Sequence, residues 1–204
     1  MALALARLAV CFILGSIPFA ALAMLGSGID IRKVGSGNPG FNNVLRVSKP
    51  RAVIALIGDM GKGFLAVWLA SSAWPPISTA YNHPSVALGW LFGFATILGH
   101  CYSPFLKFKG GKGIATSGGV MLVLYPPWAG VSLGYFVVAR VVGSFLKWPE
   151  AGAIASLTTW VVFSLLLLTF RGHGDALYAA LVTAFLFWRH ENNVRRLFAK
   201  PASA

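Results

Sequence analysis

The chain has 204 residues, of which 57% are hydrophobic and only 11% are charged, against roughly 25% charged residues in a soluble globular domain. This composition, with a mean hydropathy of +0.73, excludes an ordinary soluble domain and predicts one membrane-embedded domain over residues 1–204. The net charge of +12 indicates contact with anionic lipid headgroups or an anionic substrate, and without a basic stretch interleaved with aromatic residues it does not favour nucleic acid.

Seven apolar segments follow one another along the chain, and a helix that spans a bilayer needs roughly 20 such residues. The segments are 2–25, 53–74, 85–106, 114–124, 128–146, 151–170 and 176–188. The fourth is short and is followed by Pro126 and Pro127, which interrupt helices. We therefore predict an all-α integral membrane protein built as a bundle of seven transmembrane helices.

Positive charge falls on every second predicted loop. The loop at 26–52 holds five Lys or Arg residues, the loop before residue 114 holds Lys107, Lys109 and Lys112, and further basic residues follow the fifth and seventh segments. The second and fourth loops hold none. Because cytoplasmic loops are enriched in Lys and Arg, this alternation predicts a cytoplasmic C-terminus and an outside N-terminus. The first segment also has signal-peptide features, but cleavage after Ala23 would export the most basic loop.

The first of three polar stretches on the predicted cytoplasmic side is DIRKVGSGNPGFNNVLR, at 30–46. Its glycines let backbone N–H groups approach an anion, and its polar side chains include a fixed positive charge suited to phosphate. The candidate residues are Ser36, Gly37, Asn38, Asn43 and Arg46. The stretch contains G-x-G-x-x-G, but it follows a membrane helix and contains Pro39, so it does not indicate a dinucleotide-binding fold.

The second and third stretches lie at 99–119 and 189–198. In the second, two ammonium groups surround a flexible turn before the fourth helix, whose N-terminus adds unpaired N–H groups. Its candidates are His100, Lys109, Gly110, Gly111, Lys112 and Gly113, and those of the third stretch are His190, Asn193 and Arg196. The alternatives remain open that the lysines only determine topology and that His190 only lies in the headgroup layer.

Asp59 and Lys62 are three residues apart, so they share one face of the second predicted helix. They form either an internal ion pair or, through Lys62, part of the anion site. Cys11 and Cys101 are interpreted as buried thiols, and the His, Cys, Asp and Glu residues have no metal-ligand spacing. No G-x-S-x-G nucleophile elbow occurs, and no His is followed by Asp five residues later.

Four segments of this chain resemble the acyl-phosphate:glycerol-3-phosphate acyltransferases, the PlsY family of bacterial membrane enzymes. They are GSIPFA at 15–20, DIRKVGSGNPG at 30–40, GHCYSPFLKFKGGKGIAT at 99–116 and HENNVRRL at 190–197. The resemblance implies a seven-helix bundle in the bacterial cytoplasmic membrane, with an active site that faces the cytoplasm. It implies transfer of a fatty acyl group from acyl-phosphate to the 1-hydroxyl of glycerol 3-phosphate. It also implies no metal, cofactor or acyl-CoA, and no obligate protein partner.

The resemblance further implies roles for the candidate residues. Arg46, Lys109 and Lys112 would bind phosphate, assisted by Gly37, Asn38, Asn43, Gly110, Gly111, Gly113, Asn193 and Arg196. Ser36, His100 and His190 would orient the acyl carbonyl or the attacking hydroxyl. The substrate phosphate itself can accept the hydroxyl proton.

This chain departs from the family pattern at several positions. Phe41 replaces a small residue, Asn42 replaces a hydroxyl residue, and Glu191 and Asn192 alter the third motif. A serine expected after the fifth helix aligns with Gly143, beside Ser144. An acyltransferase for another polyol phosphate is therefore an alternative. An organic-phosphate transporter is a second, although transporters usually place polar groups near the midplane within repeats.

Overall fold

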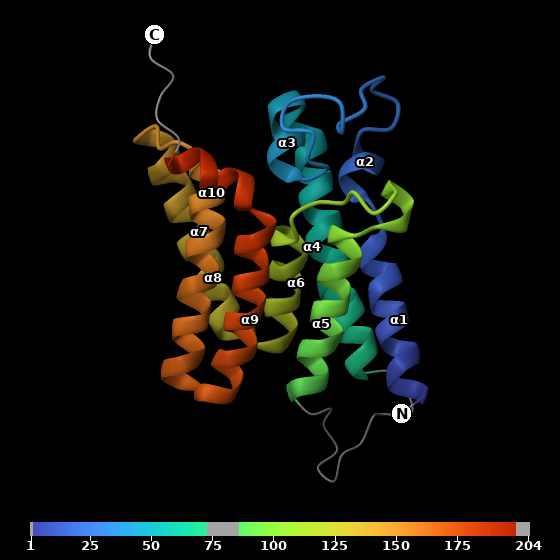
Figure 1. Cartoon of the computed structure of the whole chain (residues 1–204), viewed down its shortest axis with the longest axis vertical. Coiled ribbons are helices and arrows are strands. Elements are labelled where there is room, and N and C mark those ends of the chain that lie inside the picture. Colours follow the sequence, from blue (N-terminus) through green and yellow to red (C-terminus); the bar gives the residue numbers. More distant parts are fainter. Residues whose placement is uncertain (1, 73–85, 199–204) are drawn as a thin grey trace. The chain divides into compact units, whose positions relative to one another are not determined.

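The structure, a computed structural model, describes residues 2–72 and 86–198, all of whose regular elements are helices (Figure 1). The ends of two predicted segments, at 73–74 and 85, lie outside the described residues, as does Lys200. The chain divides into two compact units, Met1–Pro126 and Pro127–Ala204, and each is described by itself. One domain over residues 1–204 remains a prediction.

The first unit contains six α-helices and one 3₁₀ turn among its described residues. They are α1 (Ala2–Ser16), α2 (Phe19–Ala23), α3 (Phe41–Val47), α4 (Lys49–Ser72), α5 (Val86–Cys101), η1 (Pro104–Leu106) and α6 (Ile114–Leu124). The first predicted segment breaks between α1 and α2 because Pro18 has no backbone N–H and disfavours helical geometry at Ile17. The short fourth segment has the predicted bounds, 114–124.

Five helical stretches in the described ranges are long and apolar enough to cross a membrane. They are Ala2–Ala23, Lys49–Ser72, Val86–Leu106, Pro126–Phe145 and Ala151–Phe170. The remaining two predicted crossings correspond to shorter helices, α6 with 11 residues and α9 (His173–Arg189) with 17. Seven crossings and the orientation of the termini therefore remain predictions.

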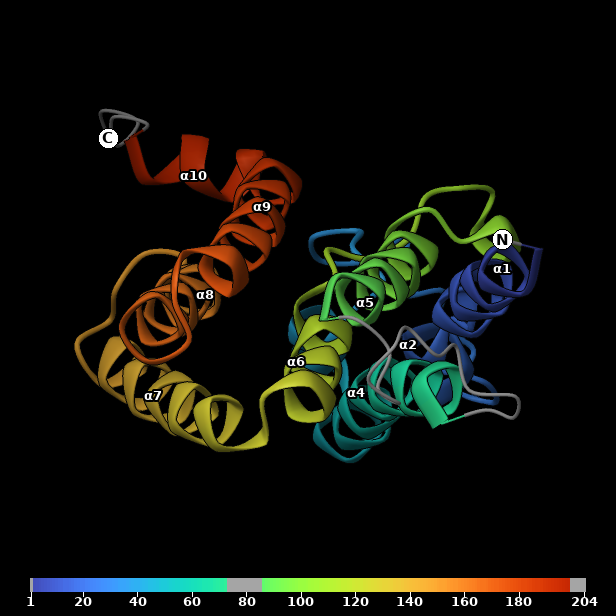
Figure 2. The same ribbon diagram turned by 90° about the horizontal axis from the view of Figure 1, so that it is seen from below.

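Two pairs of helices in the first unit meet through glycine. Figure 2 shows α1 beside α5 and α4 beside α6. At the second pair, a Cβ on Gly63 would lie 2.1 Å from the Thr116 carbonyl oxygen, and one on Gly119 would lie 2.0 Å from the Met60 carbonyl oxygen. Lipid supplies no hydrophobic force between helices, so this close backbone contact and its dispersion energy hold the pair together. The crossing fixes the start of α6 against the middle of α4.

The polar connections of the first unit gather at one end of its helices. In Figure 1 the segment between α2 and α3 and the segment between α5 and α6 both lie at this end. Arg51 donates to the carbonyl oxygens of Ala23 and Leu25, at 2.6 and 2.7 Å, and so ties the start of the first connection to α4. Ser103 donates to the Ser16 carbonyl oxygen at 2.6 Å and ties the second connection to α1.

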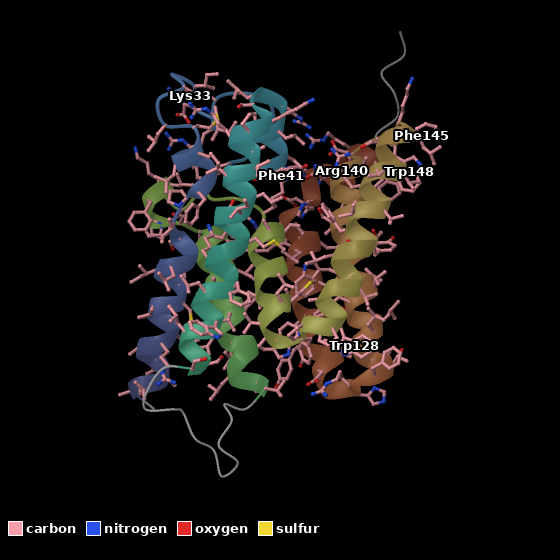
Figure 3. All side chains as sticks on the ribbon, turned by 180° about the vertical axis from the view of Figure 1, so that it is seen from behind. Lys33, Phe41, Trp128, Arg140, Phe145 and Trp148 are labelled. Atoms are coloured by element: carbon pink, nitrogen blue, oxygen red, sulfur yellow. The ribbon has the colours of Figure 1, made fainter. Side chains whose placement is uncertain are left out.

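The second unit contains α7 (Pro126–Phe145), α8 (Ala151–Phe170), α9 and the short α10 (Glu191–Phe198). Helix α8 packs along α9, where the Ser164 and Thr183 hydroxyls lie 3.1 Å apart. At one end of α7, Trp128 stacks on Phe170 with ring centroids 4.5 Å apart. Figure 3 shows Arg140, Phe145 and Trp148 toward the opposite end. Aromatic and basic residues at both ends are typical of helices that cross the membrane interfaces.

Candidate functional site

The first polar connection, between α2 and α3, is organised from inside by Asn43. Its side-chain Oδ1 accepts from the Ser36 N–H at 3.0 Å, and its Nδ2 donates to the carbonyl oxygens of Ile31 and Val34 at 2.9 and 3.0 Å. Asn43 is buried, and a Cβ on Gly35, whose φ is +57°, would lie 2.3 Å from Oδ1. The described contacts of Asn43 therefore shape the backbone of the loop.

The other candidate residues of this connection lie nearer the surface. Ser36 and Arg46 are exposed, and Asn38 is half-buried. The aliphatic part of Arg46 lies near Gly35, since a Cβ there would be 3.9 Å from Arg46 Cδ. Arg46 lies in the last turn of α3, so its fixed cation is placed beside the loop that Asn43 holds in shape. Figure 3 shows Lys33 and Phe41 at this same end of the first unit.

Asp30 and Arg32 form a local pair at the start of the loop. The Arg32 Nε and Nη2 atoms each lie 2.9 Å from a different carboxylate oxygen of Asp30. The hydrogen bonds from the Arg32 side chain, followed by that from its backbone N–H, lower the pKa of Asp30 from 3.8 to about 2. Asp30 is therefore ionised at neutral pH and compensates the charge of Arg32, not that of Arg46.

The second polar connection carries the lysines. The Gly110 and Gly111 N–H groups donate to the Cys101 and His100 carbonyl oxygens, at 3.1 and 3.2 Å. A Cβ on Gly110 would lie 2.0 Å from the His100 carbonyl oxygen, so only glycine fits there. Lys109, on one side of the two glycines, is exposed, and Lys112, on the other side, is half-buried. Gly113, with φ +91°, then caps the N-terminus of α6.

His100 lies beneath this lysine loop (residues 109–113). It is buried, and its Nδ1 is 3.4 Å from Oδ1 of Asp59. Lys62 Nζ is 2.7 Å from the same carboxylate oxygen. The predicted ion pair between Asp59 and Lys62 is present, and the structure adds His100 to it. The spacing of Asp59 and Lys62 predicted their common face, but their partner comes from another helix.

The third motif belongs to the second unit, where α9 turns into α10. His190 is buried at this turn, and its Nδ1 lies 2.8 Å from the Leu186 carbonyl oxygen. The Asn193 amide donates to Oε2 of Glu150 at 2.5 Å, and the Arg196 Nε lies 2.6 Å from Oε1 of the same residue. Glu150 thus joins two of the three candidates.

Sequence reasoning missed Glu150 as a member of the third motif. No local pattern in the sequence links Glu150 to Asn193 and Arg196, which lie more than 40 positions later in the chain. The serine expected near Gly143 has no direct counterpart: Gly143 is buried against Trp148 and Ala151, and the Ser144 hydroxyl accepts from Arg140 at 2.6 Å. Over the described ranges 2–72 and 86–198, no three His, Cys, Asp or Glu residues form a metal-binding group.

The arrangement can bind anions and place them beside apolar helices. In the first unit, Arg46 lies on α3 and Lys109 and Lys112 lie on the lysine loop just before α6, and both segments belong to the end of the helices where the polar connections gather. Phosphate is recognised by such combinations of cations, backbone amides and helix N-termini. The first two predicted motifs thus lie at the same end of one unit.

Comparison with known proteins agrees with this arrangement. The sequence profile of the family described as glycerol-3-phosphate acyltransferase matches residues 5–200. A glycerol-3-phosphate acyltransferase from Burkholderia orbicola (strain MC0-3) is 36% identical over 197 residues, which cover 95% of this chain and 89% of that protein.

Two crystal structures of PlsY (YgiH), an integral membrane glycerol 3-phosphate acyltransferase, are also similar. The glycerol 3-phosphate form is 32% identical, with a TM-score of 0.78, and the match covers 96% of this chain and 92% of that one. The lysophosphatidic acid form is 30% identical, with a TM-score of 0.78, and covers 96% of this chain and 91% of that one.

The helices and these structural matches define a multi-pass integral membrane protein of the PlsY fold. The profile spans nearly the whole chain, and the identity to the Burkholderia relative extends over the same length. The chain therefore belongs to the glycerol-3-phosphate acyltransferase family.

Proposed function

We propose that this protein transfers a fatty acyl group from acyl-phosphate to the 1-hydroxyl of glycerol 3-phosphate. The products are lysophosphatidic acid and inorganic phosphate. The protein lies in the bacterial inner membrane, and its site faces the cytoplasm. The observation that carries the proposal is the placement of two glycine-rich cationic segments, 30–46 (which runs into α3) and 109–113, at one end of apolar helices.

Each substrate of this reaction carries a phosphate, and both need cationic sites. Arg46 presents a planar guanidinium suited to bidentate phosphate binding, and Lys109 and Lys112 present ammonium groups beside two buried glycines. The N-terminus of α6, which has no side-chain cap, complements them. An acyl chain is apolar and can remain among the membrane helices while its phosphate reaches the loops.

The nucleophile is the 1-hydroxyl oxygen of glycerol 3-phosphate. It attacks the acyl carbonyl carbon, a C–O ester bond forms, and the C–O bond to phosphate breaks. The departing phosphate takes the proton that the hydroxyl loses, so no separate base is required. Positioning of the reactants and stabilisation of the phosphate charge supply the acceleration. Ser36 and His190 are the proposed orienting residues, Asn193 and Arg196 are additional substrate ligands, and His100, which is buried against Asp59 and Gly111, would act from behind the lysine loop.

Purified protein incubated with acyl-phosphate and glycerol 3-phosphate tests the proposal, with lysophosphatidic acid and released phosphate both measured. We expect equal amounts of the two products. Turnover with acyl-CoA but not with acyl-phosphate would reject the donor. Turnover with another polyol phosphate but not with glycerol 3-phosphate would select the alternative that Phe41 and Asn42 raise. Uptake of glycerol 3-phosphate into proteoliposomes without any acyl product would select a transporter.

Single variants test the phosphate ligands. Arg46→Ala, Lys109→Ala and Lys112→Ala each remove a cation from a charge-assisted contact worth about 1.5–3 kcal/mol, so kcat/KM is expected to fall roughly 10- to 150-fold. Lys49→Ala is the matched control because Lys49 is exposed at the start of α4, outside the motifs. If all three variants behaved like the control, the assignment of these residues would be wrong.

A further inference from the structure

A buried ion pair lies within α4, in the sequence DMGKG. The side chains of Asp59 and Lys62 are only 2% and 3% exposed, with Nζ 2.7 Å from Oδ1. Lys62 Nζ also donates to the Ile17 carbonyl oxygen at 2.7 Å and lies 5.9 Å from the Phe19 ring centroid. Charges inside a membrane helix are costly, and they are usually paired and functional. The surroundings of Lys62 satisfy its ammonium group internally.

The same carboxylate oxygen also faces His100, at the end of α5. The distance from Asp59 Oδ1 to His100 Nδ1 is 3.4 Å, and the ring is 7% exposed. The other ring nitrogen faces the lysine loop, because a Cβ on Gly111 would lie 2.2 Å from Nε2. The imidazole therefore fills the space between a buried carboxylate and the backbone of Gly111.

The backbone around His100 holds the same loop. Its carbonyl oxygen accepts from the Gly111 N–H at 3.2 Å, and that of the next residue, Cys101, accepts from the Gly110 N–H at 3.1 Å. The loop thus rests on the ring and on the backbone at the end of α5. Lys109 and Lys112 flank the two supported glycines, so a rotation of the ring would displace the segment that carries both cations.

We propose that Asp59, with Lys62 as its counter-ion, is a positioning residue for the lysine loop and acts through His100. This inference rests on the proposed function only in taking residues 109–113 as a phosphate-binding loop. Asp59 fixes the ring by its contact with Nδ1, and Lys62 allows the carboxylate to remain charged inside the membrane. Mutation of residues that orient metal ligands from behind typically lowers affinity or activity roughly 10- to 100-fold, and we expect an effect of this size here.

The rival explanation is that the pair serves helix assembly alone. The double variant Asp59→Asn with Lys62→Met separates the two, because it removes both buried charges together. Assembly alone predicts that the double variant has both the stability and the phosphate affinity of the wild type. Positioning predicts that the double variant has the stability of the wild type, but an affinity for glycerol 3-phosphate at least about tenfold lower. Asp175→Asn is the matched control, since Asp175, in the first turn of α9, pairs with Arg171, which directly follows α8.

His100→Asn provides a second test if the double variant does not fold. Asparagine keeps a polar group near the position of Nδ1, facing Asp59, but removes the ring atoms that contact Gly111. Positioning predicts the same loss of affinity of about tenfold or more, and assembly alone predicts a value within about twofold of the control.

Affinity is measured by calorimetry with glycerol 3-phosphate and, separately, with inorganic phosphate, and no acyl donor is present. The result is therefore independent of which donor the enzyme uses. Failure of the wild type to turn over acyl-phosphate would reject the proposed donor and leave this comparison intact. Wild-type affinity in folded Asp59→Asn/Lys62→Met or in folded His100→Asn would overturn the positioning role.

Discussion

Asn43→Ala removes the side chain that joins three backbone groups of the first connection. Its amide contacts the Ser36 N–H and the carbonyl oxygens of Ile31 and Val34, all within 3.0 Å. Each hydrogen bond contributes about 1 kcal/mol net, so the loop is expected to lose about 3 kcal/mol of local stability. That loss corresponds to a roughly hundredfold larger population of the open loop, since about 1.4 kcal/mol is tenfold.

Limited trypsin digestion after Lys33 measures this opening, because cleavage follows the open population when the loop closes faster than it is cut. We expect cleavage without substrate to rise roughly hundredfold in Asn43→Ala. The control is Asn42→Ala, because the Asn42 side chain is next in sequence but exposed, and the cleavage rate of this variant should stay within about twofold of that of the wild type. Equal cleavage of the two variants, with substrate affinity lost only in Asn43→Ala, would refute a loop-organising role and leave direct substrate binding.

Three further outcomes are expected. Gly63→Ala places a methyl group 2.1 Å from the Thr116 carbonyl oxygen and should lower the free energy of unfolding in detergent by about 1–3 kcal/mol, whereas Gly61→Ala, with open space around it, should be neutral or stabilising. The pKa of Asp30 is lowered to about 2, so the ionised carboxylate stabilises the folded protein fully above the pKa of Asp30 in the unfolded chain, and this contribution is lost as pH falls through about 2. NMR titration should show the lowered pKa, and Arg32→Ala should return it toward 3.8. Glu150→Gln should speed amide exchange in α10, with a change below about 1 kcal/mol because Arg196 is 54% exposed, and Asp175→Asn, whose pair with Arg171 lies at the start of α9, should leave exchange in α10 unchanged.

Apolar runs and prolines were sufficient to predict where most helices lie. The segments at 114–124 and 151–170 are helices with those bounds, because their ends coincide with glycine, proline and charged residues. Helices α3 and α10 were not predicted, since helices of only seven and eight residues carry little local signal and are stabilised by packing instead. The break at Pro18 was also missed inside an otherwise continuous apolar run.

The candidate site was predictable in its loops but not in its supports. Glycines and cations close together in the sequence indicated phosphate binding at 35–46 and 109–113. The contact of Asp59 with His100 depends on the packing of α4 beside α5, and that of Glu150 with Arg196 depends on the turn between α9 and α10. Such contacts join residues far apart in the chain, so no spacing rule applies to them.

The glycine crossing of α4 and α6 has a consequence for how this protein responds to its lipid environment. Met60, Gly63, Thr116 and Gly119 meet through backbone atoms, so the register of the two helices does not depend on side-chain rotamers. A bilayer of different thickness is then accommodated by tilting the pair as one body. We therefore expect Asp59 and the start of α6 to keep their separation during that tilt.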